Sequence, residues 1–198
     1  MKHLSRRLRV LALIGVLGGA GALAWTLSNV RQGYEPRQPI YFRHARMAGD
    51  PKWTVNAQGD SVNAGGFAIP CIYCHTMPYK GRHSTVPSTA VCMNCHSTVG
   101  QNREWVLKLK EYYDRGQPIP WVKVHDLPDF VYYDHSAHLN ARDDQGRLKL
   151  PLACETCHGR VQDAEIVRVQ TPFNMGWCLD CHRQPEMNAS TDCSVCHR

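Results

Sequence analysis

The sequence predicts a mainly irregular and α-helical protein, in which one long N-terminal helix precedes a domain of short helices. Two observations lead to this expectation. A stretch of 21 residues without a charged side chain runs from Val10 to Val30, and residues 31–198 hold five copies of one cysteine motif. Hydrophobic residues make up 43% of the chain and charged residues 20%, which is ordinary for a folded protein and excludes disorder.

The N-terminal segment has the pattern of a membrane anchor. Residues 1–9 carry four basic side chains and no acidic one, and the uncharged stretch follows directly. A helix rises about 1.5 Å per residue, so the stretch reaches about 30 Å, the thickness of a bilayer's hydrocarbon core. Because basic residues stay on the cytoplasmic side, we predict a cytoplasmic tail over 1–9 and a transmembrane anchor over 10–30. A signal peptide cleaved near Ala24 is the alternative, and both interpretations export residues 31–198.

All ten cysteines belong to the pattern Cys-x-x-Cys-His. The pairs are Cys71 and Cys74, Cys92 and Cys95, Cys154 and Cys157, Cys178 and Cys181, and Cys193 and Cys196, followed by His75, His96, His158, His182 and His197. This spacing is typical of covalent c-type haem attachment, in which two thiols bond the vinyl groups and the histidine is the proximal iron ligand. Zinc sites use such pairs two at a time, and disulfides require no histidine, so we predict five haem c groups.

Five haems leave roughly 33 residues of exported chain per cofactor, so the porphyrins should form most of the core and the helices should be short. A somewhat longer helix is expected over residues 102–115, with Trp105, Leu109 and Tyr112 as its apolar stripe. Residues 50–66, rich in Gly, Asn and Asp, are expected to form a polar loop.

The second ligand of each iron decides between an enzyme and an electron carrier, because only a five-coordinate iron keeps an open site. Outside the motifs, and apart from His3 in the basic tail, five histidines remain for five irons. We predict distal ligation by His44, His125, His135 and His138. Met175, Met47 and His83 are further candidates for distal ligation.

The sequence also contains an internal repeat. Residues 41–47 precede the first two haem motifs, and residues 132–138 precede the third and fourth. In each block two potential ligands lie three residues apart, so they share one helical face while serving different irons. The chain therefore divides into a half with two haems over 31–120 and a half with three haems over 121–198. Met47 occupies the place that His138 holds in the second half.

Taken together, the chain resembles the pentahaem c-type cytochrome component of bacterial alternative complex III, a quinol-oxidising membrane complex. The anchor, the five motifs and three signatures carry the resemblance; the signatures are residues 91–96, residues 121–129 leading into 134–138, and residues 175–182. The second half is also similar to class III trihaem cytochromes. That likeness implies that His135 ligates the haem at Cys154, His138 the haem at Cys178 and Met175 the haem at Cys193. The family usually has histidine at the position of Met47.

The resemblance implies an electron-transfer subunit with no catalytic residue of its own. It would lie in the bacterial inner membrane with its N-terminus in the cytoplasm and its haem domain in the periplasm. The implied partners are polytopic quinol-oxidising and iron–sulfur subunits, with a monohaem cytochrome c or a terminal oxidase as acceptor. A stand-alone quinol dehydrogenase and a multihaem reductase with an open iron are the alternatives. The charge of +6 falls to +2 without the basic tail, and we predict no nucleic-acid partner.

Overall fold

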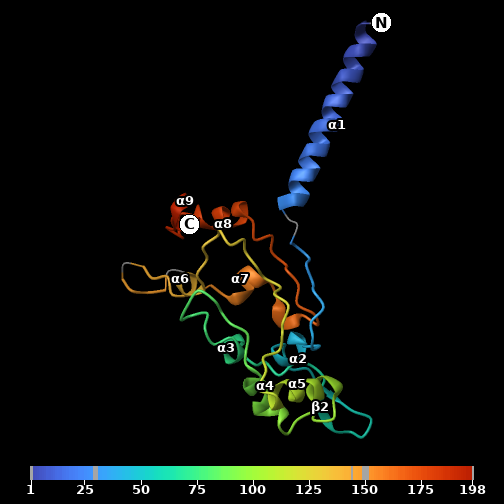
Figure 1. Cartoon of the computed structure of the whole chain (residues 1–198), viewed down its shortest axis with the longest axis vertical. Coiled ribbons are helices and arrows are strands. Elements are labelled where there is room, and N and C mark those ends of the chain that lie inside the picture. Colours follow the sequence, from blue (N-terminus) through green and yellow to red (C-terminus); the bar gives the residue numbers. More distant parts are fainter. Residues whose placement is uncertain (1, 29–30, 144, 149–151, 198) are drawn as a thin grey trace.

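The computed structural model describes residues 2–28, 31–143, 145–148 and 152–197. A long helix, α1 (Lys2–Ser28), extends away from a body of short helices and irregular segments (Figure 1). The other helices are α2 (His44–Met47), α3 (Cys71–Cys74), α4 (Thr89–His96), α5 (Glu104–Asp114), α6 (His135–Leu139), α7 (Cys154–His158), the 3-10 turn η1 (Val161–Asp163), α8 (Met175–His182) and α9 (Cys193–Cys196). The prediction of a mainly helical and irregular chain with short helices is confirmed.

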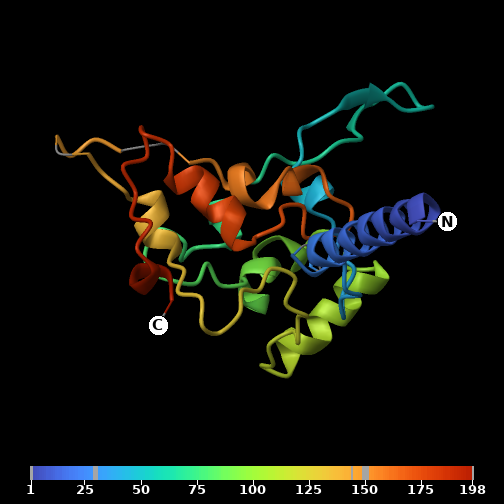
Figure 2. The ribbon, with the colours of Figure 1, turned by 90° about the horizontal axis from the view of Figure 1, so that it is seen from above.

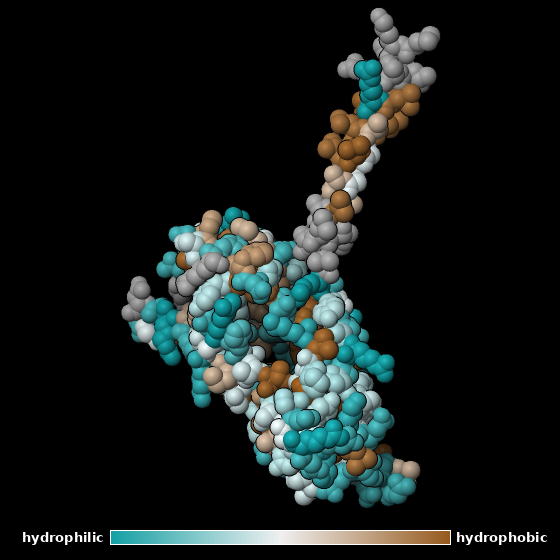
Figure 3. Space-filling model, viewed as in Figure 1, coloured by the Kyte–Doolittle hydropathy of each residue, from teal (hydrophilic) through white to brown (hydrophobic). Residues whose placement is uncertain are grey.

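The predicted anchor corresponds to most of α1. The described side chains in its middle are apolar and exposed, among them Leu11, Ile14 and Val16 (Figure 3). Residues 29–30, the end of the predicted anchor, lie outside the described part of the chain. Among the described residues, no helix is both long enough and apolar enough to qualify as a membrane span, so the anchor stays a prediction.

The polypeptide itself supplies a very small core. Among the described residues, the buried apolar side chains are Ile40, Val106, Leu109, Ile119 and Val169. The chain exposes 14555 Å², whereas a compact monomer of this mass exposes about 9,400 Å². The protruding α1 accounts for part of the excess. A small polypeptide core is the expected property of a chain whose apolar packing comes largely from porphyrins.

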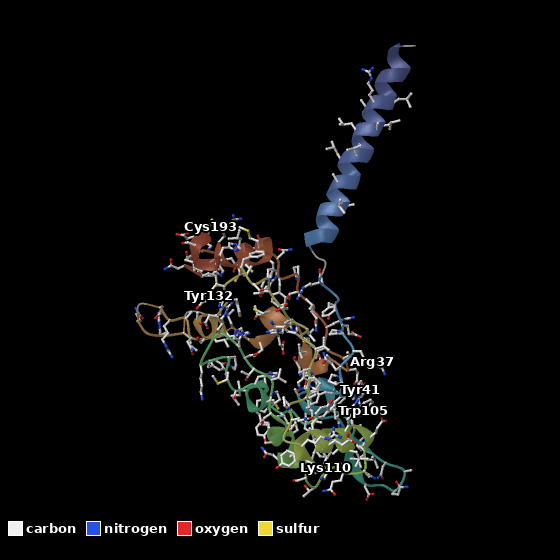
Figure 4. All side chains as sticks on the ribbon, viewed as in Figure 1. Arg37, Tyr41, Trp105, Lys110, Tyr132 and Cys193 are labelled. Carbon is white, nitrogen blue, oxygen red and sulfur yellow. The ribbon has the colours of Figure 1, made fainter. Side chains whose placement is uncertain are left out.

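Helix α5 provides two of these five buried residues. It lies inside the predicted span of 102–115 and ends where Gly116 adopts a φ of +62°, a left-handed conformation that favours glycine. Val106 and Leu109 are its buried residues, so the predicted stripe was wrong at Trp105, which is 37% exposed. Trp105 instead packs its ring 6.0 Å from that of Tyr41 at the edge of the helix (Figure 4).

Residues 50–66 form more than the predicted polar loop. They contain an antiparallel hairpin of β1 (Trp53–Val55) and β2 (Ser61–Asn63), with Trp53 opposite Asn63. The turn is closed by the Asn56 side chain, which accepts hydrogen bonds from the backbone N–H groups of Gln58 and Asp60. The hairpin projects from the body (Figure 2). The prediction failed because a three-residue strand is too short to give an alternating pattern.

The two predicted halves are in extensive contact. The backbone N–H of Ala45 donates to the carbonyl of Ala164 over 2.9 Å, and Arg43 forms an ion pair with Glu165. Nearer the N-terminus, the Gln38 side chain donates one hydrogen bond to the backbone carbonyl of Val122 and accepts another from its backbone N–H. The segment that follows α1 therefore runs along the second half, and the division at residue 120 stays a prediction.

Candidate haem sites

Each of the five cysteine pairs lies on a short helix, and these helices are α3, α4, α7, α8 and α9. One helical turn puts the two thiols of a pair on the same face, as attachment to one porphyrin requires. Two of these helices begin at a side-chain N-cap. The Asn174 side chain caps α8 by accepting a hydrogen bond from the backbone N–H of Trp177, and the Asp192 side chain caps α9 by accepting one from the backbone N–H of Ser194.

The ten cysteines are all free thiols, so the structure contains no disulfide among them. Burial raises the pKa of several of these thiols, which keeps them protonated at neutral pH; they are Cys74, Cys92, Cys154, Cys157 and Cys178. Within the described part of the chain, no group of three or more His, Cys, Asp or Glu side chains converges as a metal site.

The histidine rings are oriented by backbone carbonyls. In six of them Nδ1 lies within hydrogen-bond distance of a carbonyl oxygen, and because a carbonyl can only accept, Nδ1 must carry the proton. In the neutral form of such a ring Nε2 is the unprotonated nitrogen, which can ligate a metal. The six are His75 with Thr85 at 2.7 Å, His96 with Val99 at 3.0 Å, His135 with Arg82 at 2.8 Å, His138 with Asp134 at 2.8 Å, His182 with Ser190 at 2.7 Å and His197 with Phe130 at 3.4 Å.

Two predicted distal histidines face proximal histidines. The ring centres of His135 and His158 are 6.2 Å apart with planes 3° from parallel, and those of His138 and His182 are 6.1 Å apart. An iron bound on both sides at about 2.0 Å would separate two imidazole centres by about 6.3 Å. Both separations therefore suit an iron between the rings, and both pairs are those that the resemblance implies. Ligation itself stays a prediction.

Helix α6 holds this second-half pair in place. The Asp134 carboxylate accepts hydrogen bonds from the N–H groups of Ser136 and Ala137, and its backbone carbonyl accepts from His138. The ring of Tyr133 lies 4.9 Å from that of His135 and 4.5 Å from that of His138. One cap and one aromatic ring therefore position both candidate ligands.

We expect Asp134→Ala to destabilise the haem-loaded protein by about 1 kcal/mol, because the start of α6 loses its capping acceptor. Urea unfolding measures this loss, and broadened EPR signals of the haems at Cys154 and Cys178 would report looser ligands. Asp134→Asn keeps a side-chain oxygen and is the matched control. Equal stability of the Ala variant, the Asn variant and the wild type would rule out a positioning role.

The first half repeats this local geometry. Phe42 precedes His44 by two residues, and their rings lie 4.9 Å apart at 83°, while the rings of Tyr133 and His135 lie 4.9 Å apart at 84°. Burial, together with the nearby His75, lowers the pKa of His44 to about 4, so the imidazole is neutral as a metal ligand must be. His44 lies near His75 and therefore suits the site at Cys71, but its ligation stays a prediction.

The surroundings of His125 are those expected of a metal ligand. Its Nε2 is buried and has no hydrogen-bond partner, and burial lowers its pKa. An unpartnered buried nitrogen costs about 1–3 kcal/mol, which a bond to iron would remove. The ring lies 4.6 Å from that of His158, edge to face, and 5.8 Å from Phe173. The Nδ1 of His44 is likewise buried and unpartnered. These residues fit a haem environment.

Two of the three further candidates occupy more open positions. Met175 begins α8 and is 61% exposed, Met47 ends α2 and is partly buried, and His83 is exposed between α3 and α4. Sequence reasoning missed Arg82, whose carbonyl orients His135 and whose guanidinium donates to the carbonyls of Tyr133 and Val131. It also missed Tyr133, although its place two residues before His135 matches that of Phe42 in the repeat.

We expect Met47→His to lower the midpoint potential of one haem, because bis-histidine haems have lower potentials than His/Met haems. Met47→Leu should instead open that iron to cyanide. Met77→Leu, in a partly exposed methionine outside the predicted ligand set, is the matched control. A redox titration in which all five potentials stay unchanged would remove Met47 from the ligand set.

No protein-family model matches the sequence. Over 180 residues the chain is 28% identical to a protein of Nitratidesulfovibrio vulgaris described as menaquinone reductase, multihaem cytochrome c subunit. The aligned region covers 83% of this chain and 78% of that protein. The likeness supports a multihaem cytochrome c. It also supports covalently bound c-type haems on the cysteine motifs, where the iron would supply one-electron chemistry.

Proposed function

We propose that the chain is a pentahaem cytochrome c that transfers electrons within a quinol-oxidising membrane complex of the alternative complex III type. The observation that carries the proposal is the pairing of His135 with His158 and of His138 with His182 at separations that suit six-coordinate irons. Irons closed on both faces pass electrons and bind no substrate. An electron-transfer subunit therefore fits better than a multihaem reductase.

The link to quinol rests on two likenesses. The relative from Nitratidesulfovibrio vulgaris is named as the cytochrome subunit of a menaquinone reductase. The resemblance of the anchor, motifs and signatures to the cytochrome of alternative complex III favours electron flow from quinol towards a monohaem cytochrome c or a terminal oxidase. The proposed partners are polytopic quinol-oxidising subunits and an iron–sulfur subunit.

The proposed location is the bacterial inner membrane. Residues 10–30 would cross the bilayer once, with residues 1–9 in the cytoplasm and the haem domain in the periplasm. The 21 uncharged residues after four basic ones support this orientation. The exposed apolar side chains in the middle of α1, which points away from the body in Figure 1, support it as well.

Purification from native membranes in mild detergent tests the proposal. We expect polytopic and iron–sulfur subunits to copurify, and we expect quinol to reduce the haems and added ferricytochrome c to reoxidise them. Reduction of quinone by the haems, with no oxidation of quinol, would reverse the proposed direction. Isolation of the chain alone with quinol-oxidising activity would favour a stand-alone dehydrogenase. A high-spin iron that binds cyanide rapidly in the wild type would favour a reductase.

A further inference from the structure

We infer that the five haem sites form a single row in the order Cys92, Cys71, Cys154, Cys178 and Cys193, so that the first two sites are reversed relative to the chain. The inference rests on the proposed five haems and adds their order. Figure 1 shows α4, α3, α7 and α8 following one another along the long axis of the body, with α9 beside α8 at the same end. Contacts between the motifs support each link, meaning each pair of neighbouring sites in this order.

The first link joins the two sites of the first half. The Asn94 side chain, between the cysteines of α4, donates a hydrogen bond of 3.2 Å to the hydroxyl of Tyr73, between the cysteines of α3. The thiols are also close, because Cys95 contributes to the raised pKa of Cys74 and Cys74 to that of Cys92. These two motifs are therefore direct neighbours.

The second link joins the halves, and it decides the order. The thiols of Cys71 and Cys154 share a side-chain hydrogen bond, and α3 lies between α4 and α7 in Figure 1. The proximal histidines of the same two sites are also near each other, since His75 contributes to lowering the pKa of His158. The second half therefore meets the first at the Cys71 motif, while the Cys92 motif lies beyond it beside α5 (Figure 1).

The last two links run through the second half. Tyr133 lies beside both Cys157 and Cys178, and its ring contacts the two candidate ligands that face α7 and α8. Cys196 in turn lies close enough to Cys178 to contribute to its raised pKa. The backbone N–H of Tyr132 donates to the carbonyl of Cys196 over 2.7 Å, which ties α9 to the segment before α6.

The row has two distinct ends. Helix α9, with Cys193, lies at the level where α1 joins the body, and α4, with Cys92, lies at the opposite end (Figure 1). The three inner sites are the ones at which a candidate distal histidine lies beside the proximal one: His44 at Cys71, His135 at Cys154 and His138 at Cys178. Electrons entering at one end would therefore cross three bis-histidine sites before reaching the other.

The test uses EPR-monitored redox titration of the full-length haem-loaded protein in detergent. His135→Ala identifies the haem at Cys154 by removing its low-spin signal, and His138→Ala identifies the haem at Cys178 in the same way. His44→Met then changes the ligand at Cys71 and keeps that iron six-coordinate. We expect His44→Met to shift the midpoint of the Cys154 haem and to leave that of the Cys178 haem in place, because charge acts most strongly between neighbours.

An unchanged midpoint of the Cys154 haem would overturn the order, because the Cys71 and Cys154 haems would then not be direct neighbours. If His44→Met fails to accumulate, the iron positions in an electron cryo-microscopy structure of the wild type decide the same question. The Cys154 iron should then be nearer to the Cys71 iron than to the Cys92 iron, and the reverse would refute the row. A haem assay giving fewer than five haems per chain would contradict the proposed function, whereas five haems in another order would contradict this inference alone.

Discussion

Expression without haem attachment is expected to leave residues 31–198 unable to fold cooperatively. The structure buries few apolar side chains among its described residues, and those of Ile40, Leu109 and Ile119 form one small cluster. That core is too small to offset the conformational entropy of a domain of this length. Far-UV circular dichroism during urea unfolding should show a broad, non-cooperative change for the haem-free chain and a sigmoidal transition for the haem-loaded one.

The haem-loaded chain from a host with the attachment machinery is the control for this experiment. Limited proteolysis provides a second measure, since an uncooperative chain should be digested throughout residues 31–198 while the haem-loaded domain resists. A haem-free chain with a sigmoidal transition and a protected domain would show that the polypeptide supplies its own core, contrary to our account.

Replacing His135 by alanine is expected to convert one of the five haems from low-spin to high-spin. The iron would then keep only His158, whose ring centre lies 6.2 Å from that of His135 in the wild type. Water or cyanide can occupy the position that His135 leaves. EPR of the oxidised protein should show a high-spin ferric signal, and cyanide should abolish it. The other four haems should keep their low-spin signals.

His83→Ala is the matched control, because the side chain of His83 is exposed and its replacement should leave the spectrum unchanged. If His135→Ala kept all five haems low-spin, the pairing of His135 with His158 would be wrong. A high-spin signal in His83→Ala would instead identify His83 as a distal ligand.

The sequence predicts the local features of this fold well. The cysteine pair of each Cys-x-x-Cys-His motif lies within a helix at all five sites, and the three-residue spacing in 135–138 places both histidines on one face of α6. Helix α5 also lies within its predicted span. In each case the pattern and the structure involve residues within one or two helical turns of each other.

Features that depend on distant residues were beyond sequence reasoning. The contact between Cys71 and Cys154 joins motifs far apart in the chain, and no spacing indicates it. The carbonyl that orients His135 comes from Arg82, and the one that orients His197 comes from Phe130. A backbone carbonyl has no residue-type signature, so only the folded chain reveals these partners. The burial of Val106 in place of Trp105 likewise depends on which neighbours α5 packs against.

Intact-protein mass spectrometry after alkylation with iodoacetamide under denaturing conditions tests the central claim most directly. If all five motifs hold haem, the mass of the mature chain increases by five haem groups and none of the ten cysteines is alkylated. A mass with fewer haems, accompanied by alkylation of the remaining cysteines in pairs, would contradict the claim of a pentahaem cytochrome.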